Sequence, residues 1–523
     1  MRPRDALFFG TLFYLLLPNA LFLSGWLRPG LGWPLAGLLG VAVVLGYRAS
    51  TLSPGTTTTR RTQVFLALLA LCYALILGVG EVGHQKADYD KHNLIFHDLI
   101  TRPHPIVYEN AAYGDPLLCY YLAYYLPTAL AAKLAGGVAL ARWWSLAWGW
   151  LGLYLAFRWL HRLFTPHGGW VAGGFLAVSG LDLAVRNFWI WQELLDGSAG
   201  RYLQEYVLNL GRGPALKFYV PPHLVLSNGL TQTQLNMPAP FTQFQWAPQH
   251  ALGAWLAASL VVSQARESGN GRWLGLVAAA TLLWTPFGAV GLVPLLIWAV
   301  TRVEWRTFLT WENGLGVVLA AVIGLYFLAH LPQQYTGFLL ANFQNGGDWL
   351  LYLVFMLAHV GVFAALLFWA DRRFGILGDW RAGLLAATLG LMASSLVFLG
   401  KYNDFLMRVS LPSKWLLTAL LLYATAELWR RRHRIPALLL TGLLLFSAYY
   451  PLRETAIGAW SLTREPSVKR GITRATVNFG EADVSRIAPD PRQPGADFAA
   501  QYLGRRESVF GEFLMKPTRK PTE

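Results

Sequence analysis

Long apolar runs separated by short polar segments recur along most of the chain. A helix needs about 20 apolar residues to cross the hydrocarbon core of a bilayer, so runs near this length predict transmembrane helices. The predicted spans are residues 7–24, 31–47, 63–80, 139–158, 169–185, 250–264, 273–301, 313–331, 349–370, 382–399, 413–428 and 435–450. The pattern therefore predicts an all-α polytopic membrane protein.

The run at 273–301 is too long for one straight helix and is interrupted by the sequence WTPFG. Because proline lacks the amide N–H that continues a helix, we expect two short helices that meet at Pro286. With this pair counted as two crossings, the chain crosses the membrane about thirteen times, within a range of roughly 11 to 14.

Arginines mark every second loop. They are Arg2 and Arg4, then Arg48, Arg60 and Arg61, then Arg158 and Arg162, then Arg266 and Arg272, then Arg302 and Arg306, then Arg372, Arg373 and Arg381, and finally Arg430, Arg431, Arg432 and Arg434. Cytoplasmic loops carry an excess of basic residues, so these loops and the N-terminus are predicted to be cytoplasmic. The polar segments between them, including 84–98 and 400–413, are then external.

The same pattern divides the chain into three parts. Residues 1–62 form an N-terminal transmembrane hairpin, and 63–451 form the main transmembrane domain, with large external loops near 81–138 and 186–249. A short polar tail, 452–523, is expected to be external.

Residues 117–135 lie inside the first of these loops and contain tyrosine pairs at 120–121 and 124–125. A tyrosine stripe at helical spacing is typical of the belt that membrane proteins place at the lipid–water interface. We therefore expect this segment to lie along the outer interface rather than to cross the membrane.

Composition agrees with a membrane protein and excludes other classes. The chain is 55% hydrophobic and 14% charged, whereas soluble domains carry about 25% charge. Its net charge of +15 is dispersed over the arginine-marked loops and forms no single stripe, which argues against nucleic acid as a partner. With two cysteines, the chain has neither a disulfide framework nor a thiolate metal cluster.

One polar stretch, HQKADYDKHNLIFHD at 84–98, concentrates ionisable groups in an otherwise apolar chain. Read as a helix, it places His84, Asp88 and His92 on one face, and we expect an interfacial helix with a polar rim. A carboxylate here could act as a general base, with Asp88 and Asp90 as candidates. The alternative is a divalent cation such as Mg²⁺ or Mn²⁺, held by Asp88, Asp90 and His92.

A second polar cluster, KYNDFLMRVSLPSK at 401–414, falls on the same predicted side. Arg408 lies four residues after Asp404, so on a helix it could pair with that carboxylate or direct its guanidinium fork at a phosphate. Lys401 is either a membrane-edge anchor or a further phosphate-binding group.

With these motifs in order, the chain resembles the GT-C superfamily of membrane glycosyltransferases. In that superfamily the first large external loop carries one or two catalytic acids, here within ADYDKHN. An amphipathic segment follows, here Pro116 to Gly136, and then a span that opens with Ala-Arg, here Ala141 and Arg142. Later motifs are a Thr-x-Pro-x-Gly-like break, here TPFG at 285–288, and an external arginine before a proline, here Arg408 and Pro412. The acids are Asp-Tyr-Asp rather than adjacent, which leaves the choice between them open.

The resemblance implies a GT-C-like fold and a sugar donor carried on a polyprenyl phosphate. It implies transfer to a glycan, lipid or protein acceptor at the external, periplasmic face of a bacterial inner membrane. The base would be Asp88 or Asp90, and Arg408 would hold the donor phosphate, supported by Lys91, His92 and Lys401.

Three other functions remain open on the sequence. A transporter or flippase of lipid-linked sugars would place charges within its spans, whereas here they lie at predicted span ends. An O-antigen ligase or polymerase would place its key residues in a late loop, and this chain places its acidic site early. A scaffold protein would have no need for two charged clusters on one side.

Overall fold

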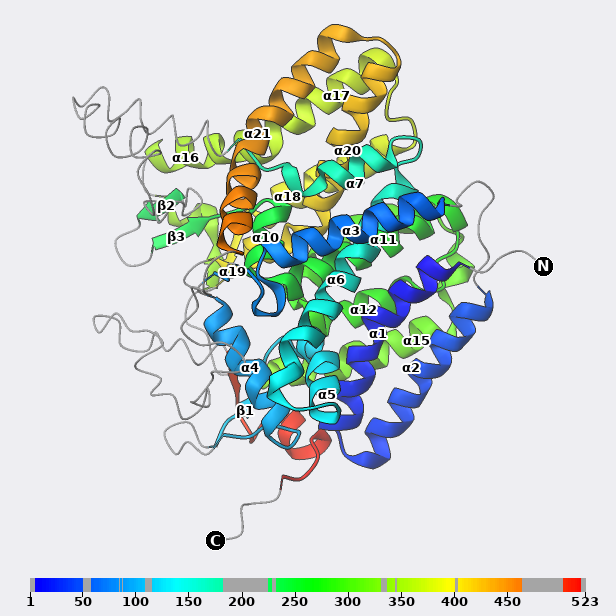
Figure 1. The fold of residues 1–523 in the computed structure, drawn as a ribbon, viewed down its shortest axis with the longest axis vertical. Coiled ribbons are helices and arrows are strands. Elements are labelled where there is room, and N and C mark those ends of the chain that lie inside the picture. The colour runs from blue at the N-terminus through cyan, green and yellow to red at the C-terminus, as the bar shows by residue number, and fades with distance from the viewer. Residues whose placement is uncertain are drawn as a thin grey trace.

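The computed structural model describes most of the chain and is mostly helical (Figure 1). The residues it describes are 5–49, 58–83, 85–86, 88–108, 115–181, 224–227, 232–330, 336–343, 346–399, 403–462 and 502–518. An all-α architecture is confirmed for these residues.

The α-helices run along the chain in this order. The first part contains α1 (Ala6–Trp26), α2 (Pro29–Ala49), α3 (Arg60–Ile76), α4 (Tyr89–Thr101), α5 (Tyr125–Leu134), α6 (Val138–Leu163), α7 (Gly168–Gly174), α10 (Pro240–Trp246), α11 (Pro248–Ser263) and α12 (Leu274–Trp284). The second part contains α13 (Pro286–Gly291), α14 (Val293–Val300), α15 (Trp311–Leu328), α16 (Gly346–Met356), α17 (Val362–Phe374), α18 (Trp380–Ser394), α19 (Asp404–Val409), α20 (Leu411–Arg430) and α21 (Arg434–Ser461).

Shorter elements connect these helices. Single 3₁₀ or π turns occupy Val79–Glu81, Leu122–Tyr124, Phe175–Ala177, Gln264–Ser268, Trp305–Phe308, Leu339–Asn342, Leu357–Gly361 and Phe510–Leu514. Three antiparallel strand pairs join β1 (Leu117–Leu118) to β6 (Leu503–Gly504), β2 (Leu224–Ser227) to β3 (Gln232–Leu235), and β4 (Thr336–Phe338) to β5 (Val397–Leu399).

Among the described residues, five helices are long and apolar enough to cross a membrane. They are Ala6–Trp26, Pro29–Arg48, Trp311–Leu328, Asp348–Phe374 and Arg434–Ser461. They are compatible with an integral membrane protein, while the count of thirteen crossings stays a prediction.

Apolar side chains on the outside of the helices support this placement. Leu438, Leu439 and Leu445 are exposed along α21, and Val64 and Phe65 are exposed along the shorter α3. Contiguous exposed apolar surface is costly in water and is the surface that lipid chains cover.

The predicted break at Pro286 is confirmed. α12 ends at Trp284 and α13 begins at Pro286, with the Thr285 hydroxyl accepting a hydrogen bond from the Gly288 amide at 3.1 Å as an N-cap. After the break, α13 and α14 are separated only by Leu292, so 286–300 forms one apolar helical segment, with Pro294 in the first turn of α14.

The predicted span at 169–185 is wrong over its described part. α7 ends at Gly174, and beyond the single turn that follows, residues 178–180 are not helical. Gly174 lets α7 approach α20 closely, since a Cβ there would lie 2.9 Å from the Leu422 side chain. Seven residues of α-helix are too few to cross a bilayer.

The predicted end of the last span is also wrong, because α21 continues through Pro451 to Ser461. Proline removes the N–H that would bond to the carbonyl four residues earlier. Here the Ser179 hydroxyl donates to that carbonyl, on Ser447, at 2.5 Å. This distant partner offsets the lost helical bond, and the polar tail therefore begins after Ser461.

Ion pairs join helix ends whose arginines predict a cytoplasmic position. Arg162 at the end of α6 pairs with Asp5 before α1 and, at 2.6 Å, with Glu267 after α11. Arg381 in α18 pairs with Asp371 in α17 at 2.5 Å. The Arg266 guanidinium lies 3.7 Å from the centre of the Trp380 ring and connects the two sets, so these helix ends lie together.

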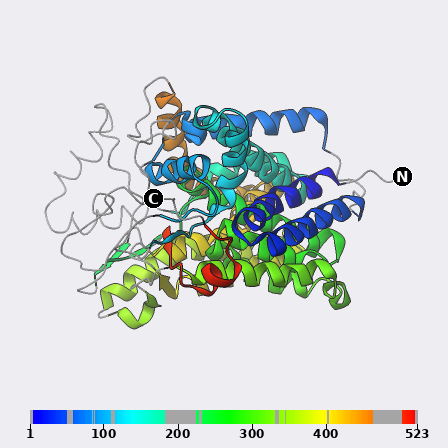
Figure 2. The same ribbon diagram turned by 90° about the horizontal axis from the view of Figure 1, so that it is seen from below.

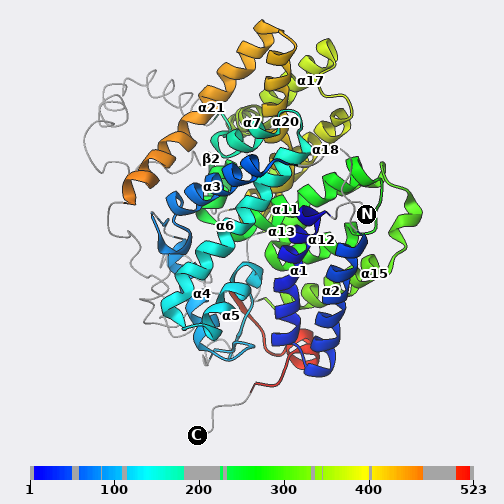
Figure 3. The same cartoon turned by 45° about the vertical axis from the view of Figure 1, so that its right-hand side comes forward.

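The C-terminal residues 502–518 pack at the opposite end. Besides the β1–β6 pair, the Lys516 amide donates to the Trp26 carbonyl at 2.8 Å and the Arg505 amide to the Ala329 carbonyl at 2.7 Å. Figures 2 and 3 show this red segment against the blue α1–α2 hairpin. Residues 502–518 therefore lie at the same end of the molecule as α4 and α5, as Figure 1 also shows.

Candidate functional site

A glycine turn positions the acidic stretch at the start of α4. Gly78 and Gly80 have φ of 79° and 70°, and a Cβ at Gly80 would lie 2.2 Å from the Arg142 carbonyl oxygen. Glycine meets both requirements at no steric cost. The Gln85 amide then donates to the Gly78 carbonyl at 2.9 Å, which ties the chain before α4 to this turn.

Asp88 is the N-cap residue of α4, and the predicted helical face through His84 is wrong. Residues 85–86 are not helical, and His84 lies outside the described residues. A carboxylate at a helix N-terminus is favoured by the helix dipole. Asp88 Oδ2 lies 2.9 Å from Lys91 Nζ one turn later, and its side chain is 39% exposed, so the carboxylate is both paired and accessible.

The polar side chains of α4 do not form the expected solvated rim. His92, Asn93 and Asp98 are buried. Each has a protein partner: Asn93 donates to the Gln85 amide oxygen at 3.1 Å, and Tyr108 donates to Asp98 at 2.9 Å. Since a buried polar group needs such partners, α4 is packed into the protein rather than laid on its surface.

Both ring nitrogens of His92 form hydrogen bonds. Nε2 donates to the Trp246 carbonyl at 3.3 Å, and Nδ1 accepts from the Tyr125 hydroxyl at 2.5 Å. Burial, with the Lys91 cation nearby, lowers the pKa of His92 to about 3. The ring is therefore neutral at physiological pH and would have to give up a hydrogen bond to bind a metal.

Arg408 lies on α19, as the second cluster predicts. Its guanidinium pairs with Asp404 at 3.0 Å, which confirms the predicted i, i+4 pair, and lies over the Tyr121 ring at 5.4 Å. α19 is fixed by α10, because the Gln243 amide donates to the Met407 carbonyl at 2.7 Å.

Charges from the two clusters act on one another across more than 300 residues of sequence. Desolvation by the surrounding protein atoms raises the pKa of Asp88, but Lys91, His92 and Arg408 together outweigh this effect, and the pKa lies below its ordinary value. Burial lowers the pKa of Lys91, but Asp88 and the nearby Tyr502 and Tyr120 leave it well above its usual range. The site thus combines an ionised carboxylate with two cations.

The tyrosine pairs do not form an interfacial belt. Tyr120, Tyr124 and Tyr125 are buried, and the Arg408 guanidinium donates to the Tyr121 hydroxyl at 3.5 Å. α5 spans ten residues, too few to cross a bilayer, which agrees with the prediction that this segment does not. Tyr120 and Tyr121, which precede α5, lie beside the charged groups of the site.

The structure adds residues that the sequence analysis missed. His250, at the start of α11, is fully buried with its ring 4.7 Å from that of Tyr121. Tyr502 reaches the site from the C-terminal segment, with its ring 4.9 Å from that of Tyr120. The polar pair Gln249-His250 at the start of an apolar run could have marked His250 as a site residue from the sequence. No pattern near Tyr502 could have marked it.

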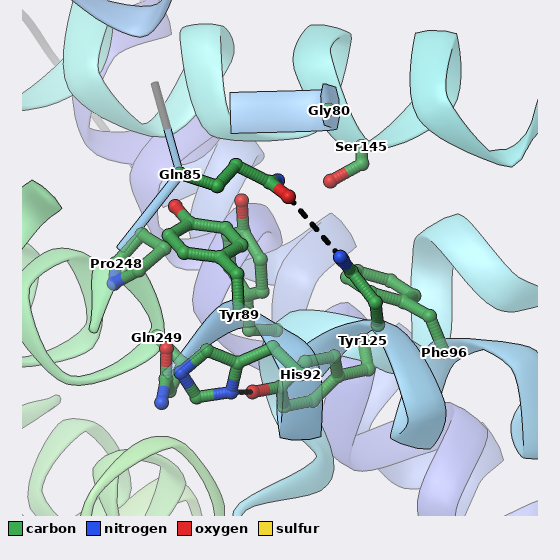
Figure 4. A pocket seen from close by; sticks show the side chains of 11 residues that line it. Gly80, Gln85, Tyr89, His92, Phe96, Tyr125, Ser145, Pro248 and Gln249 are labelled. Carbon is green, nitrogen blue, oxygen red and sulfur yellow. Dashed lines mark hydrogen bonds between the residues drawn. The ribbon is translucent and has the colours of Figure 1, made fainter. Parts of the chain in front are cut away.

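His92 also lines a small cavity (Figure 4). It has room for about one water molecule, and its other polar lining residues are Gln85, Tyr89, Asn93, Ser145 and Gln249.

Some predicted site residues cannot be placed. Lys401 lies outside the described residues, and Asp90 is part of α4, although its side chain lies outside the described structure. Within the described part of the chain, no three His, Cys, Asp or Glu side chains gather as metal ligands would. The structure thus brings Asp88, Lys91, His92 and Arg408 together and adds Tyr121, His250 and Tyr502.

Comparison with known proteins gives no family assignment: no family model, curated protein or solved structure matches this chain.

Proposed function

We propose that this protein is an integral-membrane glycosyltransferase of the GT-C type. It moves a sugar from a polyprenyl-phosphate-linked donor to an acceptor at the external face of the membrane. The observation that carries this proposal is the accessible Asp88 carboxylate beside Lys91, with Arg408 close enough to lower its pKa.

The proposed reaction uses these groups in two roles. The acceptor hydroxyl oxygen attacks the anomeric carbon, the bond from that carbon to the phosphate oxygen breaks, and polyprenyl phosphate leaves with the electron pair. A general base must take the hydroxyl proton. Asp88 is ionised and can accept it, with Asp90 as the second candidate.

Cations stabilise the charge that develops on the leaving phosphate. Arg408 provides a planar fork that suits two phosphate oxygens, and Lys91 provides a point charge that is one turn from Asp88. Neutral His92 holds Tyr125 and the Trp246 carbonyl, so its role is to fix α4 in place. Lys401 is proposed as a further phosphate contact.

The test is transfer of radiolabelled sugar from a panel of polyprenyl-phosphate sugars by the purified protein in liposomes. Wild type should move label to an acceptor, and EDTA shows whether Mg²⁺ or Mn²⁺ is needed. Asp379→Asn is a suitable control for a change at Asp88, because Asp379 is 77% exposed beside Arg302, in an arginine-marked loop. Label that crosses the bilayer without transfer would contradict the proposal and indicate a flippase.

A further inference from the structure

Six exposed arginines gather where two of the candidate membrane spans come together. The span Asp348–Phe374 ends here and the span Arg434–Ser461 begins here. The Arg431 guanidinium donates to the Phe374 carbonyl at 3.0 Å, and the centre of the Phe374 ring lies 4.3 Å from that of His433. Figures 1 and 3 show α17, α20 and α21 together in the upper part of each view. We call this surface the arginine patch, and it consists of Arg372, Arg373, Arg430, Arg431, Arg432 and Arg434.

A single carboxylate pairs with arginines of this patch in the described part of the chain. Glu427 pairs with Arg430 and with Arg431 at 2.5 Å each, and the His167 ring donates to it at 2.8 Å. Asp371, which precedes Arg372, is buried and pairs with Arg381 in α18. No carboxylate among the described residues pairs with the remaining arginines, which are Arg372, Arg373, Arg432 and Arg434.

Several other arginine-marked helix ends are neutralised within the protein. The pairs are Arg162 with Asp5 and Glu267, Arg272 with Glu312, and Arg381 with Asp371. Membrane topology requires basic residues in a cytoplasmic loop, but it does not require that they lack carboxylate partners. The arginine patch therefore carries an excess of positive charge that a negatively charged ligand can neutralise.

Apolar side chains beside the patch indicate that this ligand is a lipid. Ile435, Leu438 and Leu439 are exposed in the first two turns of α21, and Ile435 is 74% exposed. Trp369 in α17 and Trp429 in α20 are exposed as well. Tryptophan is enriched where a membrane meets water, and the guanidinium fork of arginine suits two phosphate oxygens. A soluble anion would leave the apolar side chains uncovered, whereas a phospholipid covers them with its acyl chains.

We propose that the arginine patch binds the phosphate head groups of anionic phospholipids, in the leaflet that the arginines predict to be cytoplasmic. Clusters of about four or more basic residues at the cytoplasmic end of a membrane span are typical of sites for such lipids. The head-group phosphate lies against Arg432 and Arg434, and the acyl chains lie along the start of α21. This binding is independent of the proposed sugar transfer, because Asp88 lies on the other predicted side of the membrane.

The test is native mass spectrometry of the purified protein, titrated with cardiolipin, phosphatidylglycerol or phosphatidylcholine. Wild type should bind the first two more tightly than phosphatidylcholine, because both carry a net negative charge. Arg432→Gln/Arg434→Gln should weaken binding of the first cardiolipin about 30-fold, which is about fivefold per arginine. Equal affinity of wild type for the three lipids, or unchanged affinity of the variant for cardiolipin, would overturn the proposal.

Arg60→Gln/Arg61→Gln is the matched control. These two arginines are exposed at the start of α3, on the same predicted side, and the change removes the same charge. Affinity for the first cardiolipin should stay within about twofold of wild type, because distant exposed charges are screened. A loss equal to that of Arg432→Gln/Arg434→Gln would contradict the proposal, since binding would then follow net charge rather than the patch.

Two further arms separate charge from local damage and lipid from free phosphate. Arg432→Lys/Arg434→Lys keeps the charge, so it should weaken cardiolipin binding less than the glutamine variant does. Equal loss in both variants would assign the effect to the connection between α20 and α21 and would overturn the proposal. Excess inorganic phosphate at fixed ionic strength should leave cardiolipin bound, because phosphate has no acyl chains. Complete displacement would show a site for a soluble anion instead.

Discussion

The two halves of the site treat polar groups in opposite ways. In the charged half, each charged group has a partner: Asp88 pairs with Lys91, and Arg408 with Asp404 and Tyr121. In the neutral half, Tyr89, Gln249 and His250 have buried polar atoms with no hydrogen-bond partner in the described part of the chain. Burying an unpaired ion costs far more free energy than burying an unpaired neutral amide. The difference indicates that the charged half is preorganised, whereas the neutral half keeps hydrogen-bonding groups that a water molecule could satisfy.

Loss of the guanidinium should have the largest effect on the charged half. Arg408→Ala should lower the transfer rate about 10³-fold, since one preorganised group aimed at developing charge is worth 10² to 10³. The measurement is initial rate at saturating donor, with Arg302→Ala as the control at a more exposed arginine that pairs with Asp379. Equal rates for Arg408→Ala and wild type would show that Arg408 takes no part in transfer.

The second prediction concerns the C-terminal residues 502–518, which hold Tyr502 beside the charged half. Phe510 is fully buried, with its ring 5.2 Å from that of Tyr326, so Phe510→Ala should cost about 3 kcal/mol of local stability. Tyr502 should then leave its place beside Tyr120, and Lys91 should become more reactive toward an amine-specific label, as read by mass spectrometry. Phe513→Ala is the matched control, because Phe513 is 64% exposed in the same turn.

If Lys91 reacts equally in Phe510→Ala and Phe513→Ala, the C-terminal segment does not support the charged half. Equal stability of the two variants would further show that Phe510 does not anchor the segment.

Lowering the pH should destabilise the protein through His92, with a smaller effect than the two changes above. The folded protein keeps His92 neutral down to a pH of about 3, while the unfolded chain takes up that proton near its ordinary pKa of 6.5. The unfolded state therefore binds more protons between these values, and stability falls as pH falls through this window. The loss is about 1.4 kcal/mol per pH unit for one proton.

His92→Gln keeps a donor and an acceptor but does not titrate. Its unfolding midpoint should fall less steeply than that of wild type between pH 6 and 4. His104, whose pKa burial lowers to about 4, contributes the same trend in both proteins, so the difference between the two curves is the quantity to measure. Parallel curves would mean that His92 is protonated in the folded state.

Local sequence pattern predicted the elements that depend on near neighbours. The break at Pro286 follows from a missing amide, and the Asp404–Arg408 pair follows from helical spacing. The amphipathic stretch over 89–101 does form a helix, although it starts five residues after His84.

What the sequence did not predict depends on partners far along the chain. Pro451 does not end α21, because Ser179 satisfies the carbonyl that the proline leaves free. The tyrosine pairs are buried because Tyr326 and Tyr502 pack against them, from positions about 200 and 380 residues away. No period or local propensity encodes such contacts.

The most direct test of the proposed chemistry is the single-turnover rate of sugar transfer by Asp88→Asn. This change keeps the size of the side chain and removes the base, so the rate should fall by about 10² to 10⁴. The unfolding midpoint should fall by a few degrees, because the largely buried Lys91 loses its charged partner, so the rate is compared at a temperature where both proteins are folded. A near-normal rate in a folded Asp88→Asn protein would contradict Asp88 as the base and would leave Asp90 to be tested in the same way.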